Sequence, residues 1–281
     1  MSDIKLKLSE NTNTLESALK EYYDFTNPSH ELLEAQRYAL LEGGKRIRAF
    51  LILQTCEILG GNKMSAIPYA CAIEMLHASS LIHDDLPCMD NDDYRRGKLS
   101  AHKVYGDALA LIAGDAMMLK ALEVALKNPY FSPQANARAA EILASHAGSN
   151  GMLAGQAMDI RASSAKFDPQ AILTLHNLKT TQLVCASVKL GCLAAGIAED
   201  DARYIALIKY AENVGLAFQI VDDILDYENG KLELNSFLSF MSVDEAREYS
   251  KQLTNDAINE IRFFDNGTLE DLANYLIFRK N

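Results

Sequence analysis

The sequence has little positive charge, no paired cysteine motif and no long apolar run. It carries 27 lysines and arginines against 38 aspartates and glutamates, a formal net charge of −11. This surplus of negative charge would repel a phosphate backbone, so nucleic acid is not expected as a partner. The five cysteines are an odd number without a CxxC pair, which disfavours a disulfide framework and a zinc site. These absences fit the reducing environment of the cytoplasm, and we expect a cytoplasmic protein.

Signals for export or membrane insertion are scarce as well. The N-terminal stretch MSDIKLKLSENTNTLE lacks the basic-then-apolar order of a signal peptide. The longest apolar runs, such as ASVKLGCLAAGIA, contain a lysine and fall short of the roughly 20 residues that cross a bilayer. We therefore expect a soluble protein with no transmembrane segment.

Helical periodicity dominates the chain. With 281 residues, 49% of them apolar, the protein can bury a substantial core. Apolar residues recur at steps of three and four, as in ALALIAGDAMMLKALEVALK, whereas strand-like alternation is scarce. Because no long linker or shift in composition marks a boundary, residues 1–281 are predicted to form a single all-α domain, a large helical bundle. Breaks between helices are expected at Asn27-Pro28, Gly43-Gly44, Gly60-Gly61, Pro129 to Pro133, Asp168-Pro169 and Gly230.

The stretch FQIVDDILDY places carboxylates on an apolar helix. Asp222 and Asp226 are four residues apart and share one helix face, with Asp223 beside them. Two carboxylates one turn apart repel each other, so this arrangement is destabilising unless a cation lies between them. Hard divalent cations take carboxylate oxygens for this purpose. A solvated acidic turn near a helix end is the alternative.

A second acidic motif lies in SSLIHDDLPCMDNDDYRRGK, residues 79–98. Asp90 is six residues beyond Asp84, about 240° around an ideal helix, so a straight helix cannot aim both at one ion. Pro87 disfavours helical geometry at the residue before it and removes a backbone donor. The chain is therefore expected to leave the helix here and bring Asp90 back toward Asp84.

Two arginines follow this motif directly. Arg95 and Arg96 could simply neutralise the acidic turn, of which Asp92 and Asp93 are expected to be a solvated continuation. Guanidinium groups are also the preferred planar donors to phosphate oxygens, and Mg²⁺ usually binds a few carboxylates together with substrate phosphates. Carboxylates and arginines at one place therefore indicate a metal-bridged diphosphate.

A basic cluster, GGKRIRAF, lies far upstream. Gly43 and Gly44 allow close approach of the backbone, while Lys45, Arg46 and Arg48 concentrate positive charge in an otherwise acidic chain. By itself this pattern indicates a helix cap with a basic flank, which is more often structural than functional.

These motifs together resemble the trans-prenyl diphosphate synthases, the family of the short-chain farnesyl and geranylgeranyl diphosphate synthases. The resemblance is carried, in order and rough spacing, by GGKRIR, LHASSLIHDDLPCMDNDDYRRGK, HKVYGD, GQAMDI, KTTQL and FQIVDDILD. It extends from about Tyr38 to Tyr227, with a looser continuation to the C-terminus. It implies the isoprenoid synthase fold, an all-α bundle around a deep central cavity with both aspartate motifs at its mouth, usually as a homodimer.

The resemblance also implies roles for individual residues. The implied ligands of a trinuclear Mg²⁺ cluster are Asp84, Asp85, Asp90, Asp222, Asp223 and Asp226, the last two as partial or outer ligands. The allylic substrate would be held by Arg95, Lys179, Thr180 and Gln219. Isopentenyl diphosphate would be held by Lys45, Arg48, His77 and Arg96. The residues expected to act in catalysis are Asp84, Asp90, Lys179, Thr180 and Asp222.

The implied reaction joins isopentenyl diphosphate to dimethylallyl or geranyl diphosphate and releases diphosphate. Breaking the allylic carbon–oxygen bond leaves a carbocation and a departing anion, so the site must neutralise developing negative charge with metal ions and cationic side chains. It must also exclude water, which would quench the cation to an alcohol.

The product length depends on the floor of the cavity. Ser79 and Ser80 lie five and four residues before Asp84, so each is expected to project about one helical turn below the metal site. In the family, bulky aromatic residues there often stop growth at fifteen carbons and small ones permit a longer product. The four-residue spacer of the first motif is found in bacterial farnesyl synthases and in some geranylgeranyl synthases. We expect fifteen carbons, farnesyl diphosphate, with twenty carbons, geranylgeranyl diphosphate, as the alternative. The residues expected to form the floor are Met75, Leu76 and Leu119.

One segment departs from the family. After Asp226 the family usually has a longer polar loop with a glycine-lysine pair, followed by a lysine-threonine-tyrosine-like turn, whereas YENGKLELNSFLSFMSVDEAREY joins these parts abruptly. Lys231 is therefore not assigned to the loop lysine of the family.

Two rival functions remain at this stage. A terpene cyclase would share the metal-dependent ionisation but has no use for a pocket formed by Lys45, Arg48 and Arg96. A non-catalytic partner subunit should have lost its aspartates, and both motifs are intact here.

Overall fold

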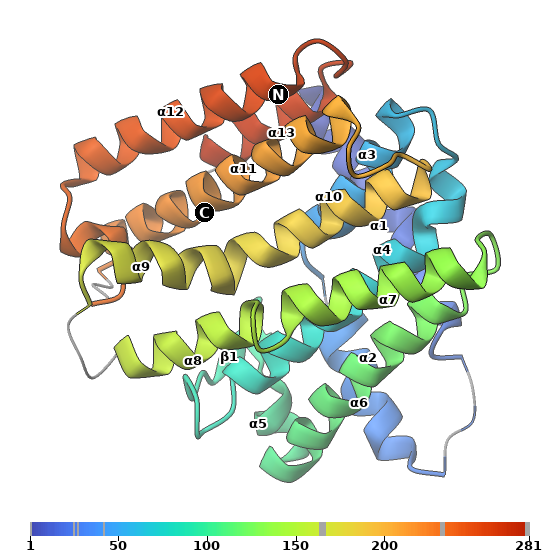
Figure 1. Cartoon of the computed structure of the whole chain (residues 1–281). Coiled ribbons are helices and arrows are strands. Elements are labelled where there is room, and N and C mark those ends of the chain that lie inside the picture. Colours follow the sequence, from blue (N-terminus) through green and yellow to red (C-terminus); the bar gives the residue numbers. More distant parts are fainter. Residues whose placement is uncertain are drawn as a thin grey trace.

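The protein is described by a computed structural model that covers residues 2–24, 26, 28–41, 43–162, 167–230 and 234–278. It is almost entirely helical, which confirms the predicted all-α class (Figure 1). The helices of the first half are α1 (Ser2–Glu21), α2 (His30–Leu41), α3 (Ile47–Ile58), α4 (Lys63–Asp84), α5 (Ala101–Tyr105) and α6 (Asp107–Leu126). Those of the second half are α7 (Pro133–Ala147), α8 (Met152–Ala162), α9 (Pro169–His176), α10 (Gln182–Ala194), α11 (Ala202–Glu228), α12 (Val243–Ile261) and α13 (Thr268–Ile277). A π-helical turn η1 (Asn177–Thr181) and a 3₁₀ turn η2 (Phe237–Ser239) complete them.

The breaks expected from glycine and proline fall between helices. Pro133 and Pro169 each occupy the first turn of a helix, where a missing N–H costs nothing, and the residue before each proline caps that helix. The side chain of Ser132 accepts from the N–H of Ala135, and that of Asp168 accepts from the N–H of Ala171. Asn27, at the first expected break, lies outside the described residues.

Helix α4 forms the centre of the bundle. It packs against α1, α2, α3, α6 and α10. Its buried residues run around most of its circumference, as its continuous apolar sequence predicts for a central span. The segment α9–η1–α10 runs between α7 and α8 on one side and α11 on the other (Figure 1). The two acidic motifs therefore lie on two long helices, at the end of α4 and within α11.

A short hairpin interrupts the helical pattern. Strand β1 (Tyr94–Arg95) pairs antiparallel with β2 (Lys98–Leu99), with Arg95 opposite Lys98. The two turn residues, Arg96 and Gly97, have positive φ angles of 53° and 79°, as in the type I′ turns that join twisted strands. The hairpin was not predicted, because two-residue strands carry no alternating pattern.

No helix in the described part of the chain is both long and apolar enough to span a bilayer. The assignment of residues 1–281 to one domain stays a prediction.

Candidate functional site

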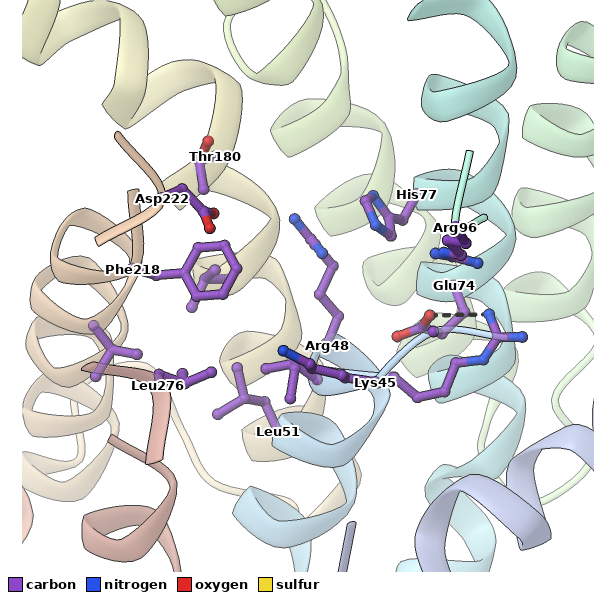
Figure 2. A pocket seen from close by; sticks show the side chains of 15 residues that line it. Lys45, Arg48, Leu51, Glu74, His77, Arg96, Thr180, Phe218, Asp222 and Leu276 are labelled. Atoms are coloured by element: carbon purple, nitrogen blue, oxygen red, sulfur yellow. Dashed lines mark hydrogen bonds and ion pairs between the residues drawn. The ribbon is translucent and has the colours of Figure 1, made fainter. Parts of the chain in front are cut away.

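Two cavities adjoin at the centre of the molecule. The first, of about 370 Å³, is bounded by the loop before α3, the middle of α4, the hairpin, and one side of α11 (Figure 2). The second, of about 360 Å³, is bounded by the end of α4, α6 and α8. Three residues line both cavities: Arg48, His77 and Thr180. The two spaces therefore share one wall.

The first cavity gathers cationic residues from three separate segments. The residues predicted to bind one diphosphate all line it: Lys45, Arg48, His77 and Arg96. In Figure 2 the side chain of Arg48 extends between Asp222 and His77. The buried Nε atom of Arg48 has no hydrogen-bond partner in the described part of the chain. The structure thus brings this predicted group together.

The ring of His77 is neutral in these surroundings. Burial lowers its pKa well below 6.5, and the guanidinium groups of Arg48 and Arg96 lower the pKa further. A neutral imidazole carries one donor and one acceptor nitrogen. His77 can therefore donate a hydrogen bond to an anion without adding charge.

A buried ion pair shapes the basic loop. Arg46 has a positive φ angle of 49°, and its guanidinium lies 3.5 Å from the carboxylate of Glu74, with both side chains almost fully buried. The other oxygen of Glu74 accepts a hydrogen bond of 3.0 Å from the N–H of Ala49 at the start of α3. Sequence reasoning grouped Arg46 with the cationic cluster and overlooked Glu74. Since a carboxylate in the apolar stretch AIEMLHASSL needs a partner, the signal was present.

Arg96 bridges the hairpin and the glycine loop. Its guanidinium donates a hydrogen bond of 2.5 Å to the carbonyl of Gly43. A Cβ atom on Gly44 would lie 2.9 Å from Cζ of Arg96 and would push the guanidinium aside, and the φ angle of +119° at this position also favours glycine. The glycines of GGKR are therefore part of the anion site.

The first acidic motif folds as predicted. Helix α4 ends at Asp84, and after the turn at Pro87 the N–H of Asp90 donates to the carbonyl of Asp84 at 2.9 Å. Burial raises the pKa of Asp84 to about 6, which Lys179 opposes and Asp90 reinforces. The charged carboxylate is thus disfavoured unless a cation joins it.

Asp85 differs from its neighbours in this motif. It is buried, and it accepts a hydrogen bond of 2.9 Å from Nε of Arg95. Nη2 of Arg95 also donates a hydrogen bond of 3.3 Å to Asp92. Asp85 therefore orients the side chain of Arg95, which is predicted to bind a diphosphate. The role of Asp85 as a direct metal ligand stays a prediction.

The second acidic motif presents its three aspartates differently. Asp222 is partly exposed and lines the first cavity, while Asp226, one turn later on the same face, is exposed. Asp223 is buried and accepts hydrogen bonds from Gln219, Ser236 and the N–H of Phe237.

The turn η1 presents Lys179 and Thr180 to the second cavity. Such π-helical turns occur frequently at functional sites. A Cβ atom on Gly155 would lie 2.3 Å from the N atom of Lys179, so glycine lets α8 approach this turn closely. Lys179 forms an ion pair with Asp159, which sequence reasoning did not assign although it belongs to the quoted motif GQAMDI.

The donor set fits a divalent cation only in part. Among the described residues, no three histidine, cysteine, aspartate or glutamate side chains converge closely enough to hold a metal ion by themselves. Asp84 nevertheless offers a hard oxygen donor, whose charged form a bound cation would favour against the effect of burial. An ion here would take further ligands from water or substrate phosphates, which is how Mg²⁺ is usually bound.

The expected chain-length residues are only partly at the cavity. Ser80 lines the second cavity. Ser79 is fully buried and donates to the carbonyl of Leu76 at 2.7 Å, and Met75 and Leu76 belong to the apolar core rather than to the wall of either cavity. Leu119 is 69% exposed, so within this chain it forms no floor. Of the residues expected to limit chain length, Ser80 is thus the one at the wall of the second cavity, and the roles of Ser79, Met75 and Leu76 stay predictions. Lys231 lies outside the described residues.

Comparison with known proteins agrees with this geometry. Residues 29–236 match the polyprenyl synthetase family. The chain belongs to this family. Among curated relatives of this polyprenyl synthetase, the heterodimeric geranylgeranyl pyrophosphate synthase large subunit 1 of Arabidopsis thaliana is 40% identical over 88% of the chain and 72% of the relative. A geranylgeranyl diphosphate synthase of Cyanophora paradoxa is 36% identical over 98% of the chain and 96% of the relative.

Solved structures share the fold of the polyprenyl synthetase. A FPP/GFPP synthase from Zymomonas mobilis aligns with a TM-score of 0.90 at 34% identity, covering 98% of this chain and 99% of that one. A geranyltransferase from Legionella pneumophila aligns with a TM-score of 0.92 at 30% identity, covering 100% and 99%. The predicted isoprenoid synthase fold is confirmed.

Gly44→Ala should weaken binding of inorganic diphosphate about tenfold, because it displaces the guanidinium of Arg96 and with it a charge-assisted hydrogen bond. Gly43→Ala is the matched control, since Gly43 also has a positive φ angle, +89°, but a Cβ atom there meets nothing within 4 Å. Titration calorimetry without divalent metal measures both variants. Equal affinities would show that contact with Arg96 does not matter.

Proposed function

We propose that this polyprenyl synthetase is a short-chain trans-prenyl diphosphate synthase, which condenses isopentenyl diphosphate with an allylic diphosphate. The main support for this proposal is the pair of adjoining cavities. One is lined by cationic residues, and the other by Asp84 and Lys179 together with apolar side chains. Two diphosphates with apolar tails require two such spaces in contact. The names of the relatives, which are prenyl diphosphate synthases, support the same conclusion.

Each cavity suits one substrate. Isopentenyl diphosphate would lie in the first cavity, with its diphosphate on Lys45, Arg48 and Arg96. The allylic diphosphate would lie at the mouth of the second, near Lys179 and Arg95, with its hydrocarbon chain against Leu111 and Leu153. In this proposed arrangement the double bond of one substrate would lie beside the reacting carbon of the other, near the residues that line both cavities.

The reaction follows from these positions. The allylic carbon–oxygen bond breaks and its electron pair leaves with the diphosphate, whose charge the ammonium of Lys179 and the guanidinium of Arg95 stabilise. The double bond of isopentenyl diphosphate attacks the resulting cation, and loss of a proton to the departed diphosphate restores a double bond. No side chain acts as a nucleophile.

Divalent ions, proposed to be three Mg²⁺, would be held by Asp84, Asp90 and Asp222, and bound metal supplies further neutralisation of the leaving diphosphate. The half-buried Lys179 remains charged beside them. Although burial by itself lowers its pKa, the carboxylates of Asp159 and Asp84 raise the pKa above its ordinary value.

Asp84→Asn should lower kcat by roughly 10²–10³, because an amide no longer supplies the anionic oxygen that binds cation and orients the leaving group. The matched control is Asp93→Asn, in the same loop, where the exposed carboxylate pairs with Lys103 at 2.7 Å. Condensation of labelled isopentenyl diphosphate with geranyl diphosphate is measured with Mg²⁺, after chelation, and after Mg²⁺ is restored. Full activity without any divalent metal would contradict the proposed mechanism.

We also propose that the product has twenty carbons in preference to fifteen. Small Ser80 on the wall of the second cavity leaves room for a growing chain, and several relatives are named geranylgeranyl diphosphate synthases. The fifteen-carbon product expected from the sequence stays a prediction and is the competing outcome.

Ser80→Phe should shorten the product by one isoprene unit, because the ring would fill part of the second cavity. Ser79→Ala, one position away but fully buried off the cavity wall, should leave the product unchanged. Chromatography of the alcohols after phosphatase treatment distinguishes geranylgeraniol, farnesol and geraniol. If the phenylalanine variant gave the wild-type product, Ser80 would not line the space that the growing chain occupies.

The chain is proposed to act as a homodimer through an apolar face. On α6, Ile112 and Leu119 are 51% and 69% exposed, and on α8, Ile160 is 49% exposed. The face continues into the second cavity, whose lining residues Leu111 and Leu153 are themselves 47% and 42% exposed. A second copy over this face would close that edge against water. A partner-subunit function is the second candidate, because one relative is named as a heterodimer subunit.

Ile112→Asp combined with Leu119→Asp should convert the dimer to a monomer and lower activity, because charge on the apolar face opposes its burial. Ile205→Asp, which charges an exposed apolar position on α11, is the control. Light scattering after gel filtration should give twice the chain mass of 31.0 kDa for the wild type and the control. A monomeric, fully active wild-type chain would contradict the proposal, and a chain active only with another subunit would favour the partner role.

A further inference from the structure

The chain after α11 returns to the site at residues Asn235–Phe237, called the clasp segment below. The side-chain amide of Asn235 donates to Asp159 on α8, and its carbonyl oxygen lies 2.8 Å from Nε2 of His176 on α9. The ring of Phe237 is buried and stacks on His176 with 4.9 Å between the ring centroids. The clasp segment is thus hydrogen-bonded to α8 and α9. Both helices pack against the turn η1, which carries Lys179 and Thr180.

Asp223 joins the clasp segment to α11. Its Oδ2 accepts hydrogen bonds from the hydroxyl of Ser236 at 2.9 Å and from the N–H of Phe237 at 2.7 Å. Its Oδ1 accepts from the side-chain amide of Gln219 at 2.9 Å. The side chain of Asp223 is only 8% exposed. Both oxygens are therefore engaged inside the protein.

These bonds determine how Gln219 points. An ionised carboxylate only accepts, so Gln219 must turn its NH₂ group toward Asp223 and its carbonyl oxygen away. That oxygen accepts a hydrogen bond of 2.7 Å from the hydroxyl of Thr180. The negative charge of Asp223 thereby sets the direction of the hydroxyl of Thr180 at the wall shared by the two cavities.

The clasp segment reaches Lys179 by a second route. Asp159 accepts from Asn235 with one oxygen and forms an ion pair with Lys179 through the other. Lys179 lies among the carboxylates of Asp159, Asp84 and Asp90, which raise its pKa against the effect of burial. One short segment therefore orients both residues of η1 that face the second cavity.

We infer that Asp223 is a positioning residue and not a metal ligand: together with the clasp segment it orients Thr180 for the allylic diphosphate. This inference rests on the proposed function. To coordinate an ion, Asp223 would have to give up hydrogen bonds to Gln219 or to the clasp segment, and leave those donors unpaired in a buried place. Asp222, in contrast, is partly exposed and lines the first cavity.

The distinction can be measured with the full-length chain and the variants Asp223→Asn and Asp222→Asn. An asparagine at position 223 keeps an acceptor for the clasp segment, but its NH₂ group forces Gln219 to turn and reverses the bond to Thr180. We expect an increase of about tenfold in the KM for geranyl diphosphate, with the KM for isopentenyl diphosphate and the Mg²⁺ concentration for half-maximal activity unchanged. Asp222→Asn should instead raise that Mg²⁺ concentration.

Ser236→Ala, which removes one bond to Asp223, should raise the KM for geranyl diphosphate in the same direction, and Ser236→Thr, which keeps the hydroxyl, should restore it. Ser239→Ala, at an exposed position of the same turn, is the control. If Asp223→Asn does not fold, these Ser236 variants test whether Asp223 and the clasp segment orient Thr180.

The inference is overturned if Asp223→Asn shifts the Mg²⁺ requirement as Asp222→Asn does, or if the KM for geranyl diphosphate stays unchanged in both Asp223→Asn and Ser236→Ala. A wild-type chain that transfers no prenyl group overturns the proposed function instead. In that case Mg²⁺-dependent binding of geranyl thiolodiphosphate to the same variants, measured by calorimetry, decides the role of Asp223.

Discussion

The burial of carboxylates on apolar helices is the constraint on which the rest of this structure depends. Asp84 and Asp85 end the central helix α4, and Asp223 lies buried within α11. Low polarity around such groups disfavours their charge, as the raised pKa of Asp84, about 6, illustrates. Each buried carboxylate must therefore find a cation or several hydrogen-bond donors. The positions of the arginines, the lysine and the returning chain follow from that requirement.

Cations and carboxylates alternate throughout the site. Arg46 pairs with Glu74, Arg95 with Asp85, and Lys179 with Asp159. Removing one partner of a buried pair leaves an uncompensated charge, so these pairs hold their side chains in place before any ligand arrives. Preorganised cations need no rearrangement when negative charge develops on a leaving diphosphate, which is the condition for electrostatic stabilisation of a transition state. The ion pairs that compensate these charges in the folded protein therefore also hold the cationic side chains in place at the candidate site.

Much of this was predictable from local patterns. Helical periodicity and the glycine and proline breaks predicted the all-α class and the ends of the helices, and Pro87 predicted the return of Asp90 to Asp84. The supporting residues Glu74, Asp159 and Ser236 were not predicted, since each is defined by a partner distant in the sequence. The hairpin at Tyr94–Leu99 and the turn η1 were not predicted either, because both are too short to produce a periodic signal in the sequence.

The sequence by itself determined the helical class, the residue types of a diphosphate site and their order along the chain, because these depend on short-range periodicity and on the chemistry of each side chain. Only the tertiary structure decided which of two neighbouring, chemically similar residues faces a cavity. Ser80 and not Ser79 lines the second cavity, and Asp222 and not Asp223 lines the first. Neighbouring residues on a helix differ by about 100° in direction, so the packing of α4 and α11 against other helices selects one and buries the other.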